Sequence, residues 1–205
     1  MGRRRAMRTV IACAAVCGMS MLAGCAPSPP APDAGTVELF DGRTLDGWDI
    51  LKCEAEVRDG AILLKSGDGI VQTKAQYADY VLELEWKALN AGAFYDSGIY
   101  LRYTEIPPNA PWPKQYQLNL TRGQEGNIPG IKAATSRGLV KEGDWNRFRV
   151  TVKGETISLE INGKPAWSVG GIRQPKGYIG LQAEVPRGGQ FLFRNIRLTP
   201  LAGGG

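Results

Sequence analysis

Apolar and polar residues alternate with a period of two along most of the chain from Thr36 onward. This alternation is typical of β-strands, whose successive side chains point to opposite faces, and the helical period of 3.6 is almost absent. The pattern predicts strands over residues 37–40, 48–51, 55–57, 61–65, 70–73, 80–87, 98–103, 116–121, 148–153, 156–161, 166–169, 178–182 and 191–199. We therefore expect an all-β domain over residues 36–201, with residues 202–205 as a disordered tail.

Tight-turn sequences separate the predicted strands, among them Asp41-Gly42, Asp59-Gly60 and Asn162-Gly163. Asn-Gly between two alternating runs is the strongest short-range signal for a β-hairpin, because both residues adopt the left-handed backbone that the turn requires. Hairpin-connected strands with one apolar face bury that face by packing two sheets together. The sequence therefore predicts a two-sheet antiparallel β-sandwich of the jelly-roll type.

Residues 1–24 have the pattern of a secretory signal, with a basic start and an apolar stretch over residues 9–21 that is too short to span a bilayer. They run into the sequence LAGC, which ends on Cys25 and resembles the lipobox of bacterial lipoproteins, where the cysteine thiol is acylated after cleavage. Residues 25–35 contain four prolines and predict an extended linker. We expect a domain anchored to the bacterial cell envelope through Cys25, facing the periplasm or the cell surface. An ordinary signal peptide is the alternative.

The formal net charge of +5 comes from the start of the chain, because Arg3, Arg4, Arg5 and Arg8 have no acidic residue near them. Without residues 1–24 the chain holds 21 basic and 20 acidic residues. A surface that reads nucleic-acid phosphates needs a basic excess on one face. The charge pattern therefore argues against nucleic acid as a partner.

The sequence contains no histidine. This excludes Ser-His-Asp and Cys-His nucleophilic centres, a histidine base and the histidine ligands of catalytic zinc. Any chemistry must then use carboxylates, amides, Lys, Tyr, Arg or an oxygen-bound metal ion. Cys53 is the one cysteine expected in the folded domain, so we expect no disulfide there and a thiol that packs as a small apolar group.

Alternation also places polar side chains together on one face of three predicted strands. These side chains are Tyr100, Arg102, Gln117, Asn119, Gln182 and Glu184. Amides and a guanidinium offer paired donors and acceptors to sugar hydroxyls, and a tyrosine offers a stacking face. The alternative is that they are simply the solvent-facing residues of a sandwich.

Several segments, in the same order along the chain, resemble the 3-keto-disaccharide hydrolase domain family. Residues 39–48 (LFDGRTLDGW) resemble its opening signature, residues 97–102 (SGIYLR) its strand that begins Asn-Ser-Gly, and residues 116–120 (YQLNL) its strand that begins Tyr-Glu. Further similar segments are residues 143–146 (GDWN), 177–182 (GYIGLQ) and 193–197 (FRNIR). The resemblance implies a concanavalin A-like jelly roll in a secreted protein or lipoprotein, and a carbohydrate ligand.

The same resemblance implies cleavage of glycosides whose C3 hydroxyl has been oxidised to a ketone. The ketone acidifies the C2 proton, so a base removes it, the anomeric substituent leaves by elimination, and water can then add. Such an enzyme needs a base near C2, stabilisation of the developing oxyanion and a proton for the leaving group. No cofactor is certain; a divalent cation is a stabiliser in keeping with the family, and here only oxygen ligands could hold it.

Two positions depart from the family pattern. Gln117 stands where the family strand carries Glu, and Ala183-Glu184 stands where many members carry His. Gln cannot act as a base, whereas Glu184 can, provided that burial or a neighbouring carboxylate raises its pKa. We therefore expect Glu184 as the catalytic base. The residues expected to hold the substrate are Tyr100, Arg102, Gln117, Asn119, Gln182 and Lys132, the last following the Pro129-Gly130 turn.

Other classes of function stay open at this point. A direct glycosidase would need two carboxylates flanking the bond, and the amide pair Gln117 and Asn119 argues against that arrangement. A non-catalytic carbohydrate-binding lipoprotein would keep the same polar face, and a structural or protein-interaction module is a third reading. An enzyme needs a second ionisable group close to Glu184, and this feature separates it from a binding module.

Overall fold

The computed structural model describes residue 2 and residues 35–202, and all regular secondary structure in that part is β-strand. The strands are β1 (Val37–Glu38), β2 (Trp48–Leu51), β3 (Glu54–Arg58), β4 (Ala61–Thr73), β5 (Tyr80–Ala88), β6 (Gly98–Tyr103), β7 (Gln117–Asn119), β8 (Asn146–Lys153), β9 (Thr156–Ile161), β10 (Lys164–Val169), β11 (Tyr178–Val185) and β12 (Phe191–Pro200). The predicted signal, the lipidation site Cys25 and the linker up to residue 34 lie outside the described residues. Within the described part, no helix long and apolar enough to cross a membrane is found.

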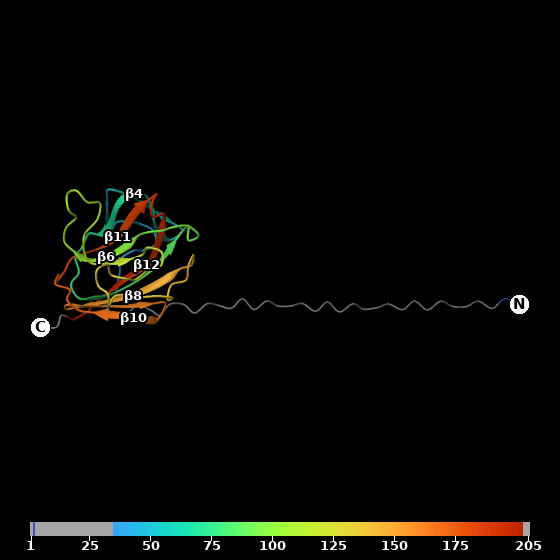
Figure 1. The fold of residues 1–205 in the computed structure, drawn as a ribbon. Coiled ribbons are helices and arrows are strands. Elements are labelled where there is room, and N and C mark those ends of the chain that lie inside the picture. Colours follow the sequence, from blue (N-terminus) through green and yellow to red (C-terminus); the bar gives the residue numbers. More distant parts are fainter. Residues whose placement is uncertain (1, 3–34, 203–205) are drawn as a thin grey trace. The chain divides into compact units, whose positions relative to one another are not determined.

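The strands form two layers that share the long strand β4 (Figure 1). Its first half pairs with β3 and β12, and its second half pairs with β2 and β11. One layer follows the order β10-β9-β8-β5-β12-β4 and the other the order β4-β11-β6-β7, with every neighbouring pair antiparallel. The predicted all-β, two-sheet antiparallel sandwich is confirmed.

The two strands predicted over residues 61–65 and 70–73 are one continuous strand, so that part of the prediction is wrong. Gly67 and Gly69, which indicate a turn in the sequence, instead let β4 continue from one layer into the other. The backbone of residues 52–53, which follows β2, passes close to β4 at these glycines. Gly67 has a φ of 85°, and a Cβ at Gly69 would lie 2.1 Å from the Leu51 carbonyl oxygen. Only glycine permits that close approach of two backbones.

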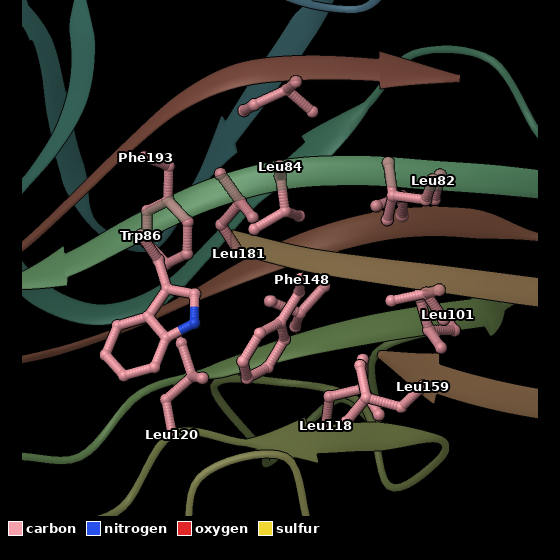
Figure 2. Close-up of a cluster of buried hydrophobic side chains, with 14 of the residues drawn as sticks. Leu82, Leu84, Trp86, Leu101, Leu118, Leu120, Phe148, Leu159, Leu181 and Phe193 are labelled. Carbon is pink, nitrogen blue, oxygen red and sulfur yellow. The ribbon is translucent and has the colours of Figure 1, made fainter. Parts of the chain in front are cut away.

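The core lies between the layers and is built from the alternate, inward-facing residues of the strands (Figure 2). Leu82, Leu84 and Trp86 of β5 pack there against Phe148 of β8 and Leu181 of β11, and all five are at most 1% exposed. Burying one such side chain contributes about 1.5–3 kcal/mol, so this cluster dominates the stability of the domain.

Cys53 follows β2 and packs at the edge of the same core. It is the free cysteine of the described residues, and burial raises the pKa of its thiol to about 11. The thiol is therefore protonated near neutral pH and unreactive. This agrees with the expectation of a packed, unpaired cysteine.

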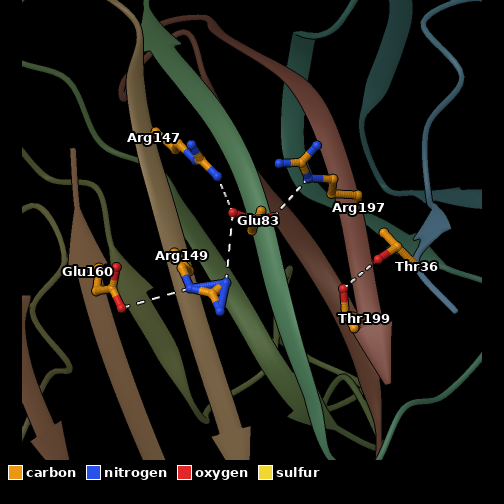
Figure 3. A network of polar contacts seen from close by, with 7 residues as sticks. All are labelled: Thr36, Glu83, Arg147, Arg149, Glu160, Arg197 and Thr199. Atoms are coloured by element: carbon orange, nitrogen blue, oxygen red, sulfur yellow. Dashed lines mark hydrogen bonds and ion pairs between the residues drawn. The ribbon is translucent and has the colours of Figure 1, made fainter. Parts of the chain in front are cut away.

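The outer face of the first layer is covered by cross-strand ion pairs (Figure 3). Glu83 of β5 lies at the centre, between Arg147 of β8 and Arg197 of β12, and accepts hydrogen bonds from both. Arg149 lies 3.8 Å from Glu83 and 3.8 Å from Glu160 of β9, which extends the network across four strands. These charges are paired with one another, so this face offers few free groups to a ligand.

Candidate functional site

The outer face of the second layer carries polar and aromatic side chains in transverse rows, set by the registers of β4, β11, β6 and β7. One row runs Ile70, Gln182, Gly98 and Asn119, and the next runs Gln72, Gly180, Tyr100 and Gln117. The side chains that alternation assigned to one face are thus brought together there, with the exceptions given below. Their roles in binding or catalysis stay predictions.

A chain of amide hydrogen bonds crosses this face and ends on Glu184. Gln117 Nε2 donates to Gln182 Oε1 at 2.5 Å, and Gln182 Nε2 donates to Glu184 Oε2 at 3.2 Å. The amide pair lies directly over Gly98, where a Cβ would come within 2.3 Å of Gln117 Nε2. The missing side chain at Gly98 makes room for the chain, whose direction leaves Glu184 as the acceptor at its end.

Glu184 lies near the end of β11 with 18% of its side chain exposed. Burial raises the pKa of this carboxyl above its usual value, and the negative charges of Asp96 and Asp68 raise it further. Arg187, whose Nε lies 3.8 Å from Glu184 Oε1, and the bond from Gln182 act in the opposite direction without cancelling the rise. Glu184 therefore holds a proton more tightly than a free glutamate does.

Asp96 is the second ionisable group beside Glu184, and the sequence reasoning did not find it. Its carboxylate is half-buried and accepts a hydrogen bond of 2.6 Å from Thr121 Oγ1, and burial raises its pKa. Alternation continued backward from Tyr100 through Gly98 would have placed it on the same face. It also stands immediately before Ser-Gly, where the resembling family strand begins with Asn.

Tyr100 lies on the same face and is 2% exposed. Its ring meets Tyr103 edge to face with the ring centroids 6.1 Å apart, and Tyr103 donates from its hydroxyl to Gln72 Oε1 at 2.8 Å. Burial raises the pKa of the Tyr100 phenol, and the charges of Asp96 and Glu184 raise it further. The phenol is therefore protonated at any physiological pH.

The loop between β6 and β7 covers the aromatic end of this face. Ile106 and Trp112 of the loop pack against the cluster that contains Tyr100 and Tyr103. Lys52 holds the loop from the other side by donating to the Ala110 carbonyl at 2.9 Å. The loop therefore covers the aromatic end, whereas Glu184 at the other end of the face keeps 18% of its side chain exposed.

Arg102 does not share the face of Tyr100, so the prediction from alternation that these two side chains point the same way is wrong. A β-bulge places Leu101 and Arg102 together opposite Ile179 of β11, and Arg102 has a φ of 49°. A bulge adds one residue and re-aims the side chain that follows.

The guanidinium of Arg102 is instead buried, with 1% of the residue exposed. It donates to the carbonyl oxygens of Ala78, Gly154 and Gln174 and pairs with Asp79 at 2.5 Å. Arg102 thus ties together three loops at the edge of the domain, and these bonds occupy its donors.

Asn119 and Lys132, also expected to contact a sugar, do not take part in the amide chain, and that contact stays a prediction. Asn119 is 8% exposed, and its Oδ1 accepts from the backbone N–H of Thr121 at 2.9 Å and lies 2.7 Å from the hydroxyl oxygen of the same residue. It therefore braces the residue that holds Asp96. Lys132 is exposed in the loop between β7 and β8, outside the rows of the face.

Two cavities of about 250 Å³ lie beside residues 114–116, the segment that leads into the edge strand β7. Both are lined by Lys114 and Tyr116, and the second also by Gln117 and Ile131. The amide chain that ends on Glu184 therefore begins at the wall of a cavity.

The expected oxygen-ligated divalent cation stays a prediction. Among residues 35–202, no group of three or more Asp, Glu, His or Cys side chains is placed to hold a metal ion. The carboxyls of Asp96 and Glu184 are bonded to Thr121 and Gln182.

Solved structures with the same fold bind or act on carbohydrates, or are named for their fold. A protein of Parabacteroides distasonis ATCC 8503, provisionally assigned as a glycosyl hydrolase, is 20% identical with a TM-score of 0.65, over 81% of this chain and 99% of that one. The carbohydrate-binding module CBM66 of Bacillus subtilis is 12% identical with a TM-score of 0.58, over 74% of this chain and 94% of that one. A Bacillus subtilis protein with a galectin-like fold is 10% identical with a TM-score of 0.55, over 79% and 94%. These likenesses support the jelly-roll architecture.

The sequence itself matches a family model over nearly all of the folded domain. A comparison with curated proteins found no significant match. The model, described as a 3-keto-alpha-glucoside-1,2-lyase-like domain, covers residues 35–199. This range agrees with the resemblance seen in the motifs from residue 39 to residue 197. The chain therefore belongs to the family of 3-keto-alpha-glucoside-1,2-lyase-like domains.

Proposed function

We propose that this domain cleaves 3-keto-glycosides by removing the proton at C2, with Glu184 as the base. The observation that carries the proposal is the pair of carboxyls Glu184 and Asp96 at the open end of the polar face. A binding module has no need of a carboxyl whose pKa is raised by a neighbouring carboxyl, whereas proton transfer near neutral pH does. The family description names the same chemistry.

The pair can supply both the base and the acid that the reaction needs. Two carboxyls close together hold a single proton over a range of pH, because the second charge is opposed by the first. Glu184, as carboxylate, takes the proton from C2, and the C–H electron pair forms the C2=C3 bond of an enediolate. Asp96, as carboxylic acid, gives its proton to the glycosidic oxygen.

The second half of the reaction follows from the enediolate. Its electrons form the C1=C2 bond as the C1–O bond breaks and the C3 ketone returns, so the alcohol leaves with the proton from Asp96. Water then adds across C1=C2: its hydroxyl goes to C1, its other proton goes to the Asp96 carboxylate, and Glu184 returns its proton to C2. The sum is hydrolysis of the glycoside, and without the water step it is elimination.

The amides Gln117 and Gln182 have a different role, because an amide does not exchange protons in this range of pH. Each uses one N–H in the chain that ends on Glu184, and each keeps a second N–H for a sugar hydroxyl. They would fix the sugar so that C2 faces Glu184. A domain that only binds carbohydrate would use the same amides, and this is the alternative that the experiment must separate.

For location, we propose that the domain is tethered to the cell envelope by a lipid on Cys25. The proposal rests on the sequence alone, on the lipobox-like LAGC and on the proline-containing linker over residues 25–35. Such a tether would hold the domain close to a membrane while leaving its polar face accessible.

Glu184→Gln tests the activity, because it keeps the shape of the side chain and removes its basicity. With a 3-keto-glycoside as substrate, we expect kcat to fall by about 10²- to 10⁴-fold while ligand affinity stays within a few-fold. Glu160→Gln, on the outer face of the other layer, is the matched control and should behave as the wild type. Wild-type turnover in Glu184→Gln would remove Glu184 from the mechanism, and binding without turnover in the wild type would favour a binding module.

A further inference from the structure

The hydroxyl of Tyr100 is the one polar group on the rows of the site face that has no hydrogen-bond partner among the described residues. The other polar side chains of the two rows are all bonded, namely Gln72, Gln117, Asn119 and Gln182. Tyr100 is nevertheless 98% buried, with its ring fixed against Tyr103. A buried hydroxyl left unpaired costs about 1–3 kcal/mol, so this position calls for an explanation.

The hydroxyl oxygen of Tyr100 is not sealed inside the protein. In the described part of the chain, the fully enclosed polar side-chain atoms without a partner are Tyr80 Oη and Trp86 Nε1, which lie in the core. Tyr100 Oη is not among them, so it keeps contact with the space above the site face. A partner that enters this space can therefore reach it.

The surroundings decide which kind of partner fits. Glu184 and Asp96, whose charges act on the Tyr100 phenol, are acceptors when ionised and repel another acceptor. The phenol stays protonated, so it is a neutral donor facing a region of acceptors. A ketone oxygen can only accept hydrogen bonds. Of Glu184, Asp96 and Tyr100, only the Tyr100 phenol is a hydrogen-bond donor at every pH of interest. Sugar hydroxyls, which also donate, suit the carboxylates instead.

We propose that Tyr100 is a further catalytic residue, whose hydroxyl donates a hydrogen bond to the C3 ketone oxygen of the substrate and stabilises the oxyanion that forms there. The inference rests on the proposed function. When Glu184 takes the C2 proton, the C–H electron pair enters the C2=C3 bond and the carbonyl π pair moves onto O3. Tyr100 keeps its proton and shares it with O3, so the step needs no further reactant. A donor fixed in a dry site costs no reorganisation as the charge develops.

The test uses a 3-keto-1,5-anhydrohexitol, which carries the ketone but no leaving group at C1, together with its parent 1,5-anhydrohexitol. Tyr100→Phe removes only the unbonded hydroxyl, so folding should be unaffected. Tyr80→Phe is the matched control, because it removes a buried, unpartnered hydroxyl from the core. Calorimetry gives the affinity for both ligands, and NMR in deuterated water gives the rate of exchange at C2.

We expect the wild type to prefer the keto ligand, and Tyr100→Phe to lose about tenfold of this preference and about 10²-fold of the exchange rate. Tyr80→Phe should keep both within about twofold. If Tyr100→Phe keeps the ligand preference and the exchange rate of the wild type, the inference is overturned. This holds even if exchange in the wild type supports the role of Glu184 as the base. Absence of exchange in every protein overturns the proposed function and the catalytic part of the inference, while the binding measurement still decides whether Tyr100 holds the ketone.

Discussion

Asp96 and Glu184 are joined through the backbone of Gly188. The N–H of Asp96 donates to the Gly188 carbonyl, and the N–H of Gly188 donates to the Glu184 carbonyl. Asp96 precedes β6 and Glu184 belongs to β11, and the two residues lie 88 positions apart in the sequence. Their spacing is therefore fixed by main-chain hydrogen bonds, and the electrostatic effect of one carboxyl on the other is a built property of the site.

Asp96→Asn tests this electrostatic effect. The negative charge of Asp96 raises the pKa of Glu184, so its removal should lower that pKa. In the proposed mechanism Glu184 acts when ionised and Asp96 when protonated, so kcat/KM of the wild type rises with the first ionisation of the pair and falls with the second. The charge of one carboxyl raises the pKa of that second ionisation, which sets the basic limb. The basic limb should therefore disappear in Asp96→Asn, and the maximal rate should fall because the acid is lost.

The measurement is the pH dependence of kcat/KM for a 3-keto-glycoside, since this quantity reports the pKa values of the free enzyme. Asp144→Asn, on the exposed turn before β8, serves as the control and should leave the profile unchanged. A basic limb that persists unchanged in Asp96→Asn would contradict the coupling.

Gly188→Ala tests the backbone joint. A Cβ at Gly188 would lie 2.2 Å from the Asp96 carbonyl oxygen and 2.9 Å from that of Glu184, so the two segments must move apart. We expect kcat to fall by at least about tenfold and the free energy of unfolding by about 1–3 kcal/mol. Gly170→Ala is the control, because a Cβ there meets nothing within 4 Å. Kinetics and urea unfolding of both variants would show whether the joint matters, and wild-type kcat in Gly188→Ala would show that it does not.

The fold could be predicted from the sequence because most strands have one face in the core and one face outside it. Alternation then marks each strand, as in residues 80–87 and 148–153, and Asn162-Gly163 forms the expected tight turn with positive φ at both residues. The prediction failed at β4, where glycines between residues 65 and 70 indicate a turn. There the close passage of another backbone, which alternation does not encode, keeps the strand continuous.

The site was predicted in part for the same reason. Gln117, Gln182 and Glu184 lie where alternation places them, because β7 and β11 pair without a bulge around them. Arg102 was misplaced because a bulge changes the period within β6. Asp96 was missed because it precedes β6, outside the predicted strand, and its proximity to Glu184 depends on long-range pairing.

Cys25→Ala tests the proposed tether. With radiolabelled fatty acid supplied to cells that express the full chain, the wild type should incorporate label and fractionate with membranes. Cys25→Ala should incorporate none and appear in the soluble fraction. Cys53→Ala is the control, because that thiol packs against the core and should not be acylated. Equal labelling of the wild type and Cys25→Ala would contradict the lipidation.

Arg102→Lys separates a structural role of Arg102 from a role in holding sugar. Lysine keeps the charge but lacks the planar fork, so it cannot serve Asp79 and the three loop carbonyls together. Each buried acceptor left without its donor costs about 1–3 kcal/mol. We therefore expect the free energy of unfolding to fall by at least about 2 kcal/mol, while KM of the folded enzyme for a 3-keto-glycoside stays within about twofold.

The matched control is Arg122→Lys, since Arg122 pairs with Glu142 at the surface, where both side chains are about half exposed. An exposed pair of this kind contributes about 0–1 kcal/mol, so the urea midpoint should hardly change. The free energy of unfolding and KM of Arg102→Lys together assign the role of Arg102, because a structural role lowers the first and a binding role raises the second. A residue that holds the sugar would raise KM at little cost in stability, and that result for Arg102→Lys would restore Arg102 to the binding site and contradict its assignment as a tie between loops.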